Sequence, residues 1–261
     1  MDFGLAGKTA IVTGASQGIG RAITRALHAE GVTVLIVGQT RAHLEQTERD
    51  CGGGGAPLHL VVADLSLLAE VERVAAEAIR LMKHVDILVN TAARNKSGGI
   101  FTLKDGDIQD AWQVKGMGYL RMVRAVAPHM MERGGGRIVN IVGSAARTPT
   151  ADFIPGAMVN AALVSFTRGV SRELARRNVR INSISPGWTL TERQERIYEM
   201  EAMAQNVPVQ HVRDKAAMSI PTGKHVSMAE IASMTLMLVS DLTPGLTGED
   251  IVIDGGVTQS I

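Results

Sequence analysis

Short runs of β-branched and aliphatic residues alternate along the chain with longer segments in which apolar positions recur at helical spacing. Each short run is almost continuously apolar, which is typical of a strand buried on both faces of a parallel sheet. The strands are expected at 9–12, 33–37, 58–62, 87–89, 138–142, 179–184 and 251–253. The helices between them are expected at 18–30, 41–50, 66–82, 107–131, 151–177 and 228–240.

This alternation predicts one Rossmann-like α/β domain over residues 1–261, with a doubly wound, seven-stranded parallel sheet and helices on both faces. Only residues 188–227 break the alternation. They contain many charges and three methionines, namely Met200, Met203 and Met218. We expect a helical substrate lid beyond the carboxyl ends of the strands, where flexible methionine side chains can adapt to a ligand. A surface excursion that packs on a neighbouring subunit is the alternative.

Composition narrows the range of functions. The 261 residues are 45% hydrophobic and carry a net charge of +1 without a basic run, which argues against binding to nucleic acid. No stretch reaches the ~18 consecutive apolar residues that would predict a membrane span. The single cysteine, Cys51, cannot form an internal disulfide, and the opening residues do not resemble a signal peptide. We therefore expect a cytoplasmic protein.

A glycine-rich turn joins the first strand to the first helix, with the sequence Thr13-Gly14-Ala15-Ser16-Gln17-Gly18-Ile19-Gly20. Gly14 permits a tight turn, Gly18 lets the backbone approach a pyrophosphate, and Gly20 lets the helix and the strand pack closely. The unpaired N–H groups at the start of the helix favour an anion. The turn therefore predicts a dinucleotide cofactor.

Further landmarks follow the later strands, in an order that extends over essentially the whole chain. They are Asp64-Leu65, Asn90-Thr91-Ala92-Ala93, Gly143-Ser144, Pro186-Gly187-Trp188-Thr189 and Asp254-Gly255-Gly256. Together with the glycine-rich turn, this set resembles the short-chain dehydrogenase/reductase family. The resemblance implies binding of NAD or NADP and hydride transfer between the nicotinamide and a carbonyl or hydroxyl carbon of a small molecule.

The resemblance also implies which residues meet the cofactor. Those expected near its phosphates and adenosine are Gly14, Ser16, Gln17, Gly18, Ile19, Gly20, Asp64 and Leu65. Those expected near the second ribose and the nicotinamide are Asn90, Ala92, Asn160, Pro186, Gly187 and Thr189.

The choice between NAD and NADP depends on the end of the second strand, where an acidic residue normally binds the ribose 2′-hydroxyl of NAD. The residues here are Gly38-Gln39-Thr40-Arg41, without an acid, and Arg41 could accept a 2′-phosphate. We therefore favour NADP over NAD, with Gln39 and Arg41 as contacts. Gln17 weakens this choice, since NADP-binding members often carry Arg or Lys there. Alternatively, Arg41 lies in the first turn of a solvated helix.

The resemblance breaks down at the catalytic residues. The family uses a Ser, a Tyr and a Lys four residues after the Tyr, with an Asn on the preceding helix. Ser144 matches the Ser, but Gly156 stands at the Tyr position and Asn160 at the Lys position, while Lys115 stands where the Asn is expected. We hypothesise an exchange, in which the Lys115 ammonium enters the same cavity from the opposite helix and contacts Asn160 or the ribose. The alternative is two independent losses, with Lys115 extending to solvent.

Without the Tyr, the proton donor is not defined. The glycine at its position is expected to leave space that a larger substrate could fill. Tyr119, Asp152 and Ser144 are candidate donors, although Tyr119 is more simply a packed aromatic. We predict an oxidoreductase with an altered relay built from Ser144, Lys115 and Asn160. A non-redox enzyme on the same fold and a non-catalytic cofactor-binding subunit are the alternatives.

Three cations follow the fourth and fifth strands on the ligand side of the sheet, namely Arg94, Lys96 and Arg147. They could receive an anionic substrate such as a carboxylate or phosphate ester, or they could serve solubility alone. The 7 histidines show no metal-binding spacing, so no metal is predicted. The resemblance implies a homodimer through the long helices at 107–131 and 151–177, or a homotetramer completed by the C-terminal strand.

Overall fold

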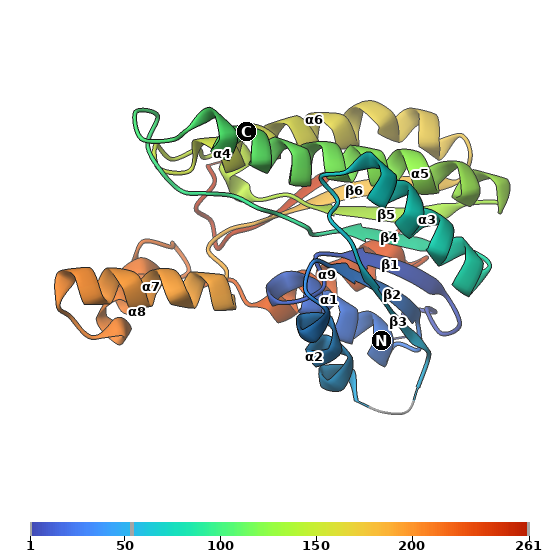
Figure 1. Cartoon of the computed structure of the whole chain (residues 1–261), viewed down its shortest axis with the longest axis horizontal. Helices are drawn as coiled ribbons and strands as arrows, with labels where there is room; N and C mark the ends of the chain where they lie inside the picture. Colours follow the sequence, from blue (N-terminus) through green and yellow to red (C-terminus); the bar gives the residue numbers. More distant parts are fainter. Residues whose placement is uncertain (1, 53–54, 260–261) are drawn as a thin grey trace.

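In the computed structural model, which describes residues 2–52 and 55–259, a 7-stranded parallel sheet has the order β3-β2-β1-β4-β5-β6-β7 (Figure 1). Its strands are β1 (Thr9–Thr13), β2 (Thr33–Gly38), β3 (Leu58–Val62), β4 (Ile87–Asn90), β5 (Gly136–Ile141), β6 (Val179–Pro186) and β7 (Asp250–Ile253). The chain winds outward from β1 to β3 and returns to place β4 beside β1, which is the doubly wound topology. The predicted Rossmann-like class is confirmed.

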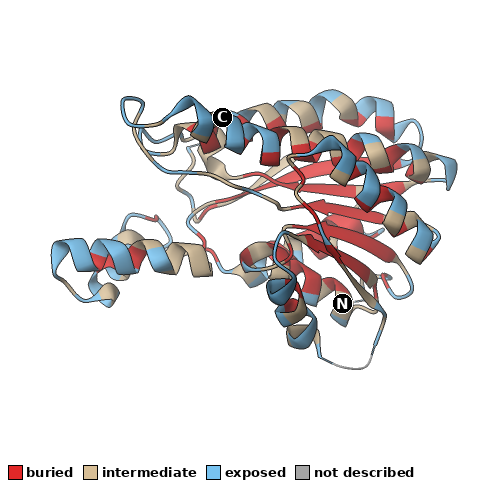
Figure 2. Cartoon of the chain, viewed as in Figure 1, coloured by how far each residue is buried: buried red, intermediate tan, exposed pale blue. Residues whose placement is uncertain are grey.

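Helices cover both faces of the sheet, and the strands between them are buried (Figures 1 and 2). One layer contains α3 (Leu68–Met82), α5 (Gly118–Glu132) and α6 (Ile154–Ala175), and the other contains α1 (Gly18–Ala29), α2 (Arg41–Cys51) and α9 (Met228–Val239). Each layer encloses its own apolar core, because consecutive residues of a strand point to opposite faces. Ile11 and Leu35 belong to one core, and Val12 and Ile36 to the other.

The helix predicted over 107–131 is interrupted. It consists of α4 (Asp105–Ala111), a π-helical segment (Trp112–Met117) and α5. The apolar periodicity did not reveal the break, because one wide turn shifts the phase of the pattern by a single residue. Such π-helical turns are frequent at functional sites. This one carries Lys115, whose side chain is buried.

Residues 188–227 contain a hairpin of two helices, α7 (Glu192–Gln205) and α8 (Val209–Met218), that projects from the body of the protein (Figure 1). A small core holds the two helices together, with Tyr198, Ala202 and Val212 buried in it. The methionines expected to line a ligand site are instead 62%, 82% and 83% exposed at positions 200, 203 and 218. These side chains lie outside the small core of the hairpin, so the expectation that they contact a ligand stays a prediction, as does the alternative that the hairpin packs on a neighbouring subunit.

Two structural features are absent from the described residues. None of their helices combines the length and the apolar character needed to cross a membrane. They also hold no group of three or more His, Cys, Asp or Glu side chains arranged to bind a metal ion.

Candidate active site

The glycine-rich turn brings β1, α1 and the loop after β4 into close backbone contact. A Cβ atom on Gly14 would lie 2.7 Å from the Cα atom of Ala92, and one on Gly20 would lie 2.3 Å from the carbonyl oxygen of Gly14. Gly14 and Gly18 also have positive φ angles, of 65° and 56°. Only glycine satisfies both conditions at Gly14, since other residues rarely adopt this conformation.

A cavity of about 390 Å³ lies against this turn, at the carboxyl ends of β1, β2 and β3. The predicted cofactor residues that line it are Gly14, Ser16, Gln17, Gln39, Leu65 and Ala92. Gly18, Ile19 and Gly20 form the first turn of α1. A site that joins a helix start to the ends of neighbouring strands fits the adenosine and pyrophosphate of a dinucleotide.

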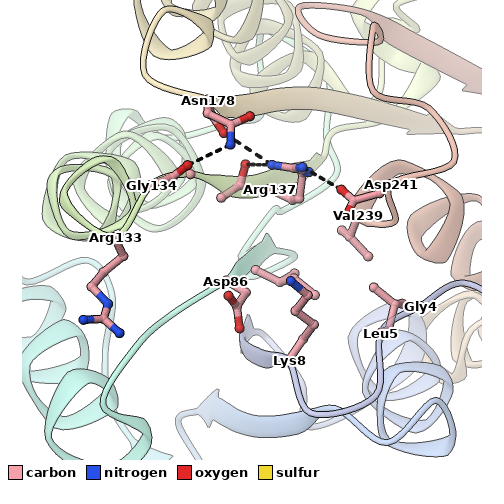
Figure 3. A pocket seen from close by; sticks show the side chains of 13 residues that line it. Gly4, Leu5, Lys8, Asp86, Arg133, Gly134, Arg137, Asn178, Val239 and Asp241 are labelled. Carbon is pink, nitrogen blue, oxygen red and sulfur yellow. Dashed lines mark hydrogen bonds and ion pairs between the residues drawn. The ribbon is translucent and has the colours of Figure 1, made fainter.

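A second cavity, of about 240 Å³, lies at the opposite edge of the sheet, where β1, β4 and β5 begin (Figure 3). It is lined by Lys8, Asp86 and Arg137, among others, and Arg137 pairs with Asp241 at 2.6 Å. Open α/β sheets bind ligands at the carboxyl ends of their strands. The first cavity is therefore the candidate site.

Asp64 and Arg41 have partners that limit their expected roles. Asp64 pairs with Arg94 at 3.3 Å and accepts the N–H of Ser66 at 2.9 Å. Burial acts to raise the pKa of Asp64, but these hydrogen bonds outweigh it and hold the pKa below its usual value. Arg41 pairs with Glu45 at 3.0 Å, is largely exposed and lies outside the cavity lining. Its position matches the alternative of a first-turn residue on a solvated helix.

Two cationic or titratable side chains that the sequence analysis missed do line the cavity, namely His43 on α2 and Arg196 on α7. His43 lies two residues beyond Arg41 on the same helix, so helical spacing could have suggested it. Nothing in the sequence could have indicated Arg196, because only the fold of residues 188–227 brings it to the cavity.

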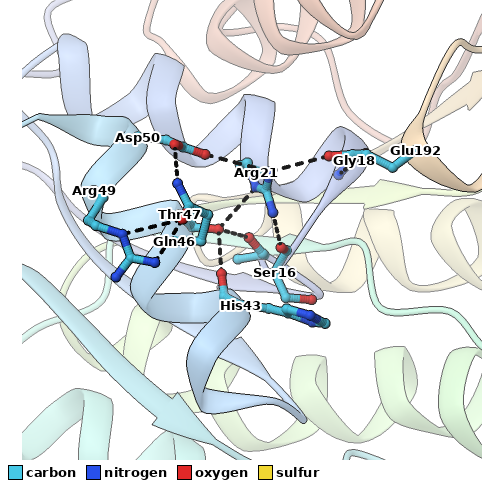
Figure 4. Close-up of polar contacts among 10 residues, drawn as sticks. Ser16, Gly18, Arg21, His43, Gln46, Thr47, Arg49, Asp50 and Glu192 are labelled. Atoms are coloured by element: carbon cyan, nitrogen blue, oxygen red, sulfur yellow. Dashed lines mark hydrogen bonds and ion pairs between the residues drawn. The ribbon is translucent and has the colours of Figure 1, made fainter.

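A carboxylate of α7 holds the start of α1 (Figure 4). The N–H of Gly18 donates to Oε2 of Glu192 at 2.9 Å, and Arg21 pairs with Oε1 of the same side chain at 3.3 Å. Arg21 also donates to the carbonyl oxygen of Ser16 at 2.6 Å. A helix start favours any anion, whether a side chain or a phosphate. The Glu192 carboxylate therefore accepts the same Gly18 N–H that could otherwise donate to a pyrophosphate.

The remaining predicted cofactor residues lie further along the same edge. The Asn90 side chain is fully buried and donates to Oδ1 of Asn140 at 2.9 Å, so it serves the sheet and leaves only its backbone for the cleft. Pro186 and Gly187 follow β6, where the N–H of Gly187 donates to the carbonyl oxygen of Ile253 at 2.8 Å. Thr189 donates to the carbonyl oxygen of Gly187 at 3.0 Å.

Lys115 and Asn160 meet in the interior. The ammonium of Lys115 donates to Oδ1 of Asn160 at 2.8 Å and to the carbonyl oxygen of Val142 at 2.5 Å, and the residue is only 4% exposed. Asn160 packs against Gly143, where a Cβ atom would lie 2.7 Å from its Nδ2. The predicted contact between the exchanged residues is confirmed, and the alternative of a solvent-directed lysine is wrong. Lys115 and Asn160 therefore lie against Val142 and Gly143, the two residues that precede Ser144.

The surroundings of Lys115 destabilise its charge. Burial, followed by the positive charge of Arg193, lowers the pKa of Lys115 to about 7. Tyr119 is buried on the same helical stretch and donates to the carbonyl oxygen of Ile141 at 3.0 Å. Burial raises the pKa of Tyr119 well above its ordinary value. Tyr119 is thus the packed aromatic of the simpler interpretation, whereas burial of Lys115 favours the neutral amine over the ammonium.

The space expected beside Gly156 is occupied. A Cβ atom on Gly156 would lie 2.2 Å from the ring of Phe153, which covers the start of α6. The prediction of an open space was wrong, because Phe153 immediately precedes the helix and can fold back over a residue without a side chain. Asp152 is exposed, and its backbone carbonyl accepts the N–H of Gly98 at 2.7 Å.

Comparisons with known proteins agree with this geometry. A family model described as Enoyl-(Acyl carrier protein) reductase matches residues 14–258. The 2,3-dihydro-2,3-dihydroxybenzoate dehydrogenase of Bacillus subtilis (strain 168) is 32% identical over 258 residues, covering 99% of this chain and 98% of that protein. The chain belongs to the short-chain dehydrogenase/reductase family. As a short-chain dehydrogenase/reductase, it is an NAD(P)-dependent oxidoreductase by family.

Solved structures are similar to essentially the whole chain. L-sorbose reductase from Gluconobacter frateurii, in complex with NADPH and L-sorbose, superposes with a TM-score of 0.96 at 27% identity, over 100% of both chains. A variant of actinorhodin polyketide ketoreductase with NADPH gives a TM-score of 0.92 at 28% identity, over 97% of this chain and 98% of that one.

The three cations expected to receive an anionic substrate already form ion pairs within the chain. Arg94 pairs with Asp64 at 3.3 Å, Lys96 with Asp107 at 3.2 Å and Arg147 with the buried carboxylate of Asp250 at 3.0 Å. The structure does not support this expectation, because each positive charge is already balanced by an acid of the chain. None of these acids is adjacent to its partner in sequence.

Replacing Glu192 with glutamine is expected to tighten binding of NADPH to the protein by about fivefold, the equivalent of ~1 kcal/mol at a helix start. Glutamine can still accept the N–H of Gly18, but it neither repels a pyrophosphate nor occupies Arg21 as an ion pair. Titration followed by nicotinamide fluorescence measures the change. Glu201→Gln, on the exposed face of the same helix, is the control. Unchanged or weaker binding by Glu192→Gln would contradict this account.

Proposed function

We propose that this protein binds NADPH and reduces a carbonyl group of a small molecule, with the Lys115 ammonium as the proton donor in place of a tyrosine. The observation that carries the proposal is the buried contact of Lys115 with Asn160 and Val142, beside Ser144. It supports an altered relay rather than a decayed site, because both exchanged residues keep partners in the interior.

The chemistry of an ammonium suits this position. When bound, NADPH supplies the hydride that forms the new C–H bond, and the carbonyl oxygen takes up a proton to give an alcohol. An ammonium has three N–H donors, and two of those of Lys115 are held by Val142 and Asn160. The third is available to donate to the substrate oxygen, after which the neutral amine recovers a proton from solvent. Ser144 is proposed to hold the same oxygen through its hydroxyl.

Three observations support NADP rather than NAD. The end of β2 carries no acid, since Gln39 and Thr40 stand there. His43 and Arg196 line the adjoining cavity and can face a 2′-phosphate. The L-sorbose reductase and the actinorhodin ketoreductase contain NADPH, whereas 7α-hydroxysteroid dehydrogenase, 25% identical with a TM-score of 0.88, contains NADH.

The substrate is proposed to be a small carbonyl or hydroxyl compound, and the assembly a homodimer or a homotetramer. Support for an assembly comes from the two long helical stretches, where the apolar side chains of Trp112 and Met158 are 41% and 54% exposed. Measurement of the molar mass in solution tests the assembly, and a monomer at micromolar concentration would refute it.

Reduction is expected to weaken as the pH rises through the pKa of Lys115. Only the protonated ammonium can donate, so kcat/KM for reduction should be level at lower pH and fall about tenfold per pH unit above the midpoint. The pKa of Lys115, lowered to about 7, places that midpoint near neutrality, and alcohol oxidation should show the opposite slope. Initial rates with NADPH and a panel of ketones between about pH 6 and pH 9 measure both. A level profile, or NADPH binding without reduction of any ketone, would refute the proposed function.

A further inference from the structure

Arg193 has no acidic partner among the described residues. It lies in the first turn of α7 and is half-buried, and its Nη2 donates to the carbonyl oxygen of Asn95 at 2.8 Å. Burial, followed by the charge of Arg196, lowers its pKa. A guanidinium has five N–H donors, so a single carbonyl contact leaves most of them for another group.

Four acids near Arg193 in sequence or on the helix before Lys115 already have other partners. Glu192 contacts Gly18 and Arg21, and Glu195 pairs with Arg213. Asp107 and Asp110, on the helix before Lys115, pair with Lys96 and Arg94. In contrast to Arg94 and Lys96, Arg193 therefore has no carboxylate within the described part of the chain that balances its charge.

Arg193 also lies close enough to Lys115 for its charge to lower the pKa of that residue. The partners of Lys115 are a carbonyl oxygen and an amide oxygen, both neutral. Arg193 and Lys115 are thus two cations that interact with each other, and neither forms an ion pair with a carboxylate of the described residues. Charges removed from water are normally paired, because an unpaired charge there is costly. A bound anion would balance these two positive charges.

We propose that Arg193 binds a carboxylate of the substrate, so that this enzyme acts on oxo acids in preference to neutral ketones. This rests on the proposed function. A guanidinium and a carboxylate can form two parallel hydrogen bonds, which fix the orientation of the substrate as well as its charge. In this arrangement the carboxylate of the substrate lies beside α7, and the carbonyl oxygen of the substrate points to Lys115. Oδ1 of Asn95 is buried without a partner beside the Arg193 contact, and it can accept a substrate hydroxyl.

Matched acid and ester substrates test the proposal. The probes are benzoylformate and methyl benzoylformate, which share the reacting ketone and differ in charge. We expect the wild type to reduce the acid with the higher kcat/KM, by about tenfold or more. Arg193→Met should raise KM for the acid by a similar factor and shift KM for the ester much less, and Arg193→Lys should recover part of the loss. Lys215→Met, which removes an exposed charge from α8 of the same hairpin, is the control.

A binding measurement separates this proposal from the proposed function. Benzoate and benzamide are titrated into the NADPH complex of the wild type and of Arg193→Met. Tighter binding of benzoate that is lost in Arg193→Met supports the carboxylate site even if neither ketone is reduced, in which case only the reductase function fails. Equal binding of benzoate and benzamide, or equal effects of Arg193→Met on acid and ester, would overturn the carboxylate site while leaving carbonyl reduction intact.

Discussion

Replacing Lys115 with methionine is expected to lower kcat/KM for NADPH-dependent reduction by about 10²–10⁴-fold, the usual contribution of a general acid. Methionine has a similar length but no proton to donate, and it leaves the carbonyl oxygen of Val142 and Oδ1 of Asn160 without their donor. Tyr119 cannot compensate, because its hydroxyl is buried against Ile141 and its pKa lies well above the ordinary value.

Two further variants distinguish the loss of a proton donor from the loss of a positive charge and from a general loss of stability. Lys115→Arg keeps the positive charge, but arginine does not lose its proton near neutral pH, so it should be as inactive as Lys115→Met. Lys96→Met makes the same change at a largely exposed lysine that pairs with Asp107, and it should keep the wild-type rate. Initial rates and thermal unfolding are measured for all three. Full activity of a folded Lys115→Met protein would show that another group donates the proton.

Gly20→Ala is expected to abolish tight NADPH binding and to destabilise the fold by about 1–3 kcal/mol, the usual cost of overpacking. The added Cβ atom would lie 2.3 Å from the carbonyl oxygen of Gly14 and 2.5 Å from Oγ1 of Thr91. Because the first of these atoms is backbone, no side-chain rotation relieves the clash. The turn between β1 and α1 must open, which displaces the N–H groups that face the pyrophosphate.

The matched control is Gly169→Ala on α6, where an added Cβ atom has nothing within 4 Å. It should leave the Kd for NADPH unchanged and stabilise the protein by about 0.5–1 kcal/mol, because alanine is the better helix former. Fluorescence titration and urea unfolding give both quantities. If Gly20→Ala binds NADPH as tightly as Gly169→Ala does, the turn is not the phosphate site.

Local patterns in the sequence pointed to several residues that line the cavity at the glycine-rich turn. The Thr13–Gly20 turn and the polar ends of β2 to β4 depend on residue type and on spacing to a strand, and both are readable along the chain. Arg41, which we expected as a phosphate contact, pairs with Glu45 and lies outside the cavity lining. His43 and Arg196 line the cavity instead, and the second of these comes from a helix more than a hundred residues away in sequence.

The sequence by itself determined the doubly wound sheet, the dinucleotide turn and the exchange of lysine and asparagine between two helices. Each of these follows from apolar periodicity or from a motif at a known distance from a strand. Only the tertiary structure decided that Lys115 contacts both Asn160 and Val142, that Phe153 fills the space beside Gly156, and that Arg193 contacts the backbone of Asn95 without pairing with an acid of the described chain. Burial and charge pairing between distant elements arise when the elements pack, and no local pattern encodes them.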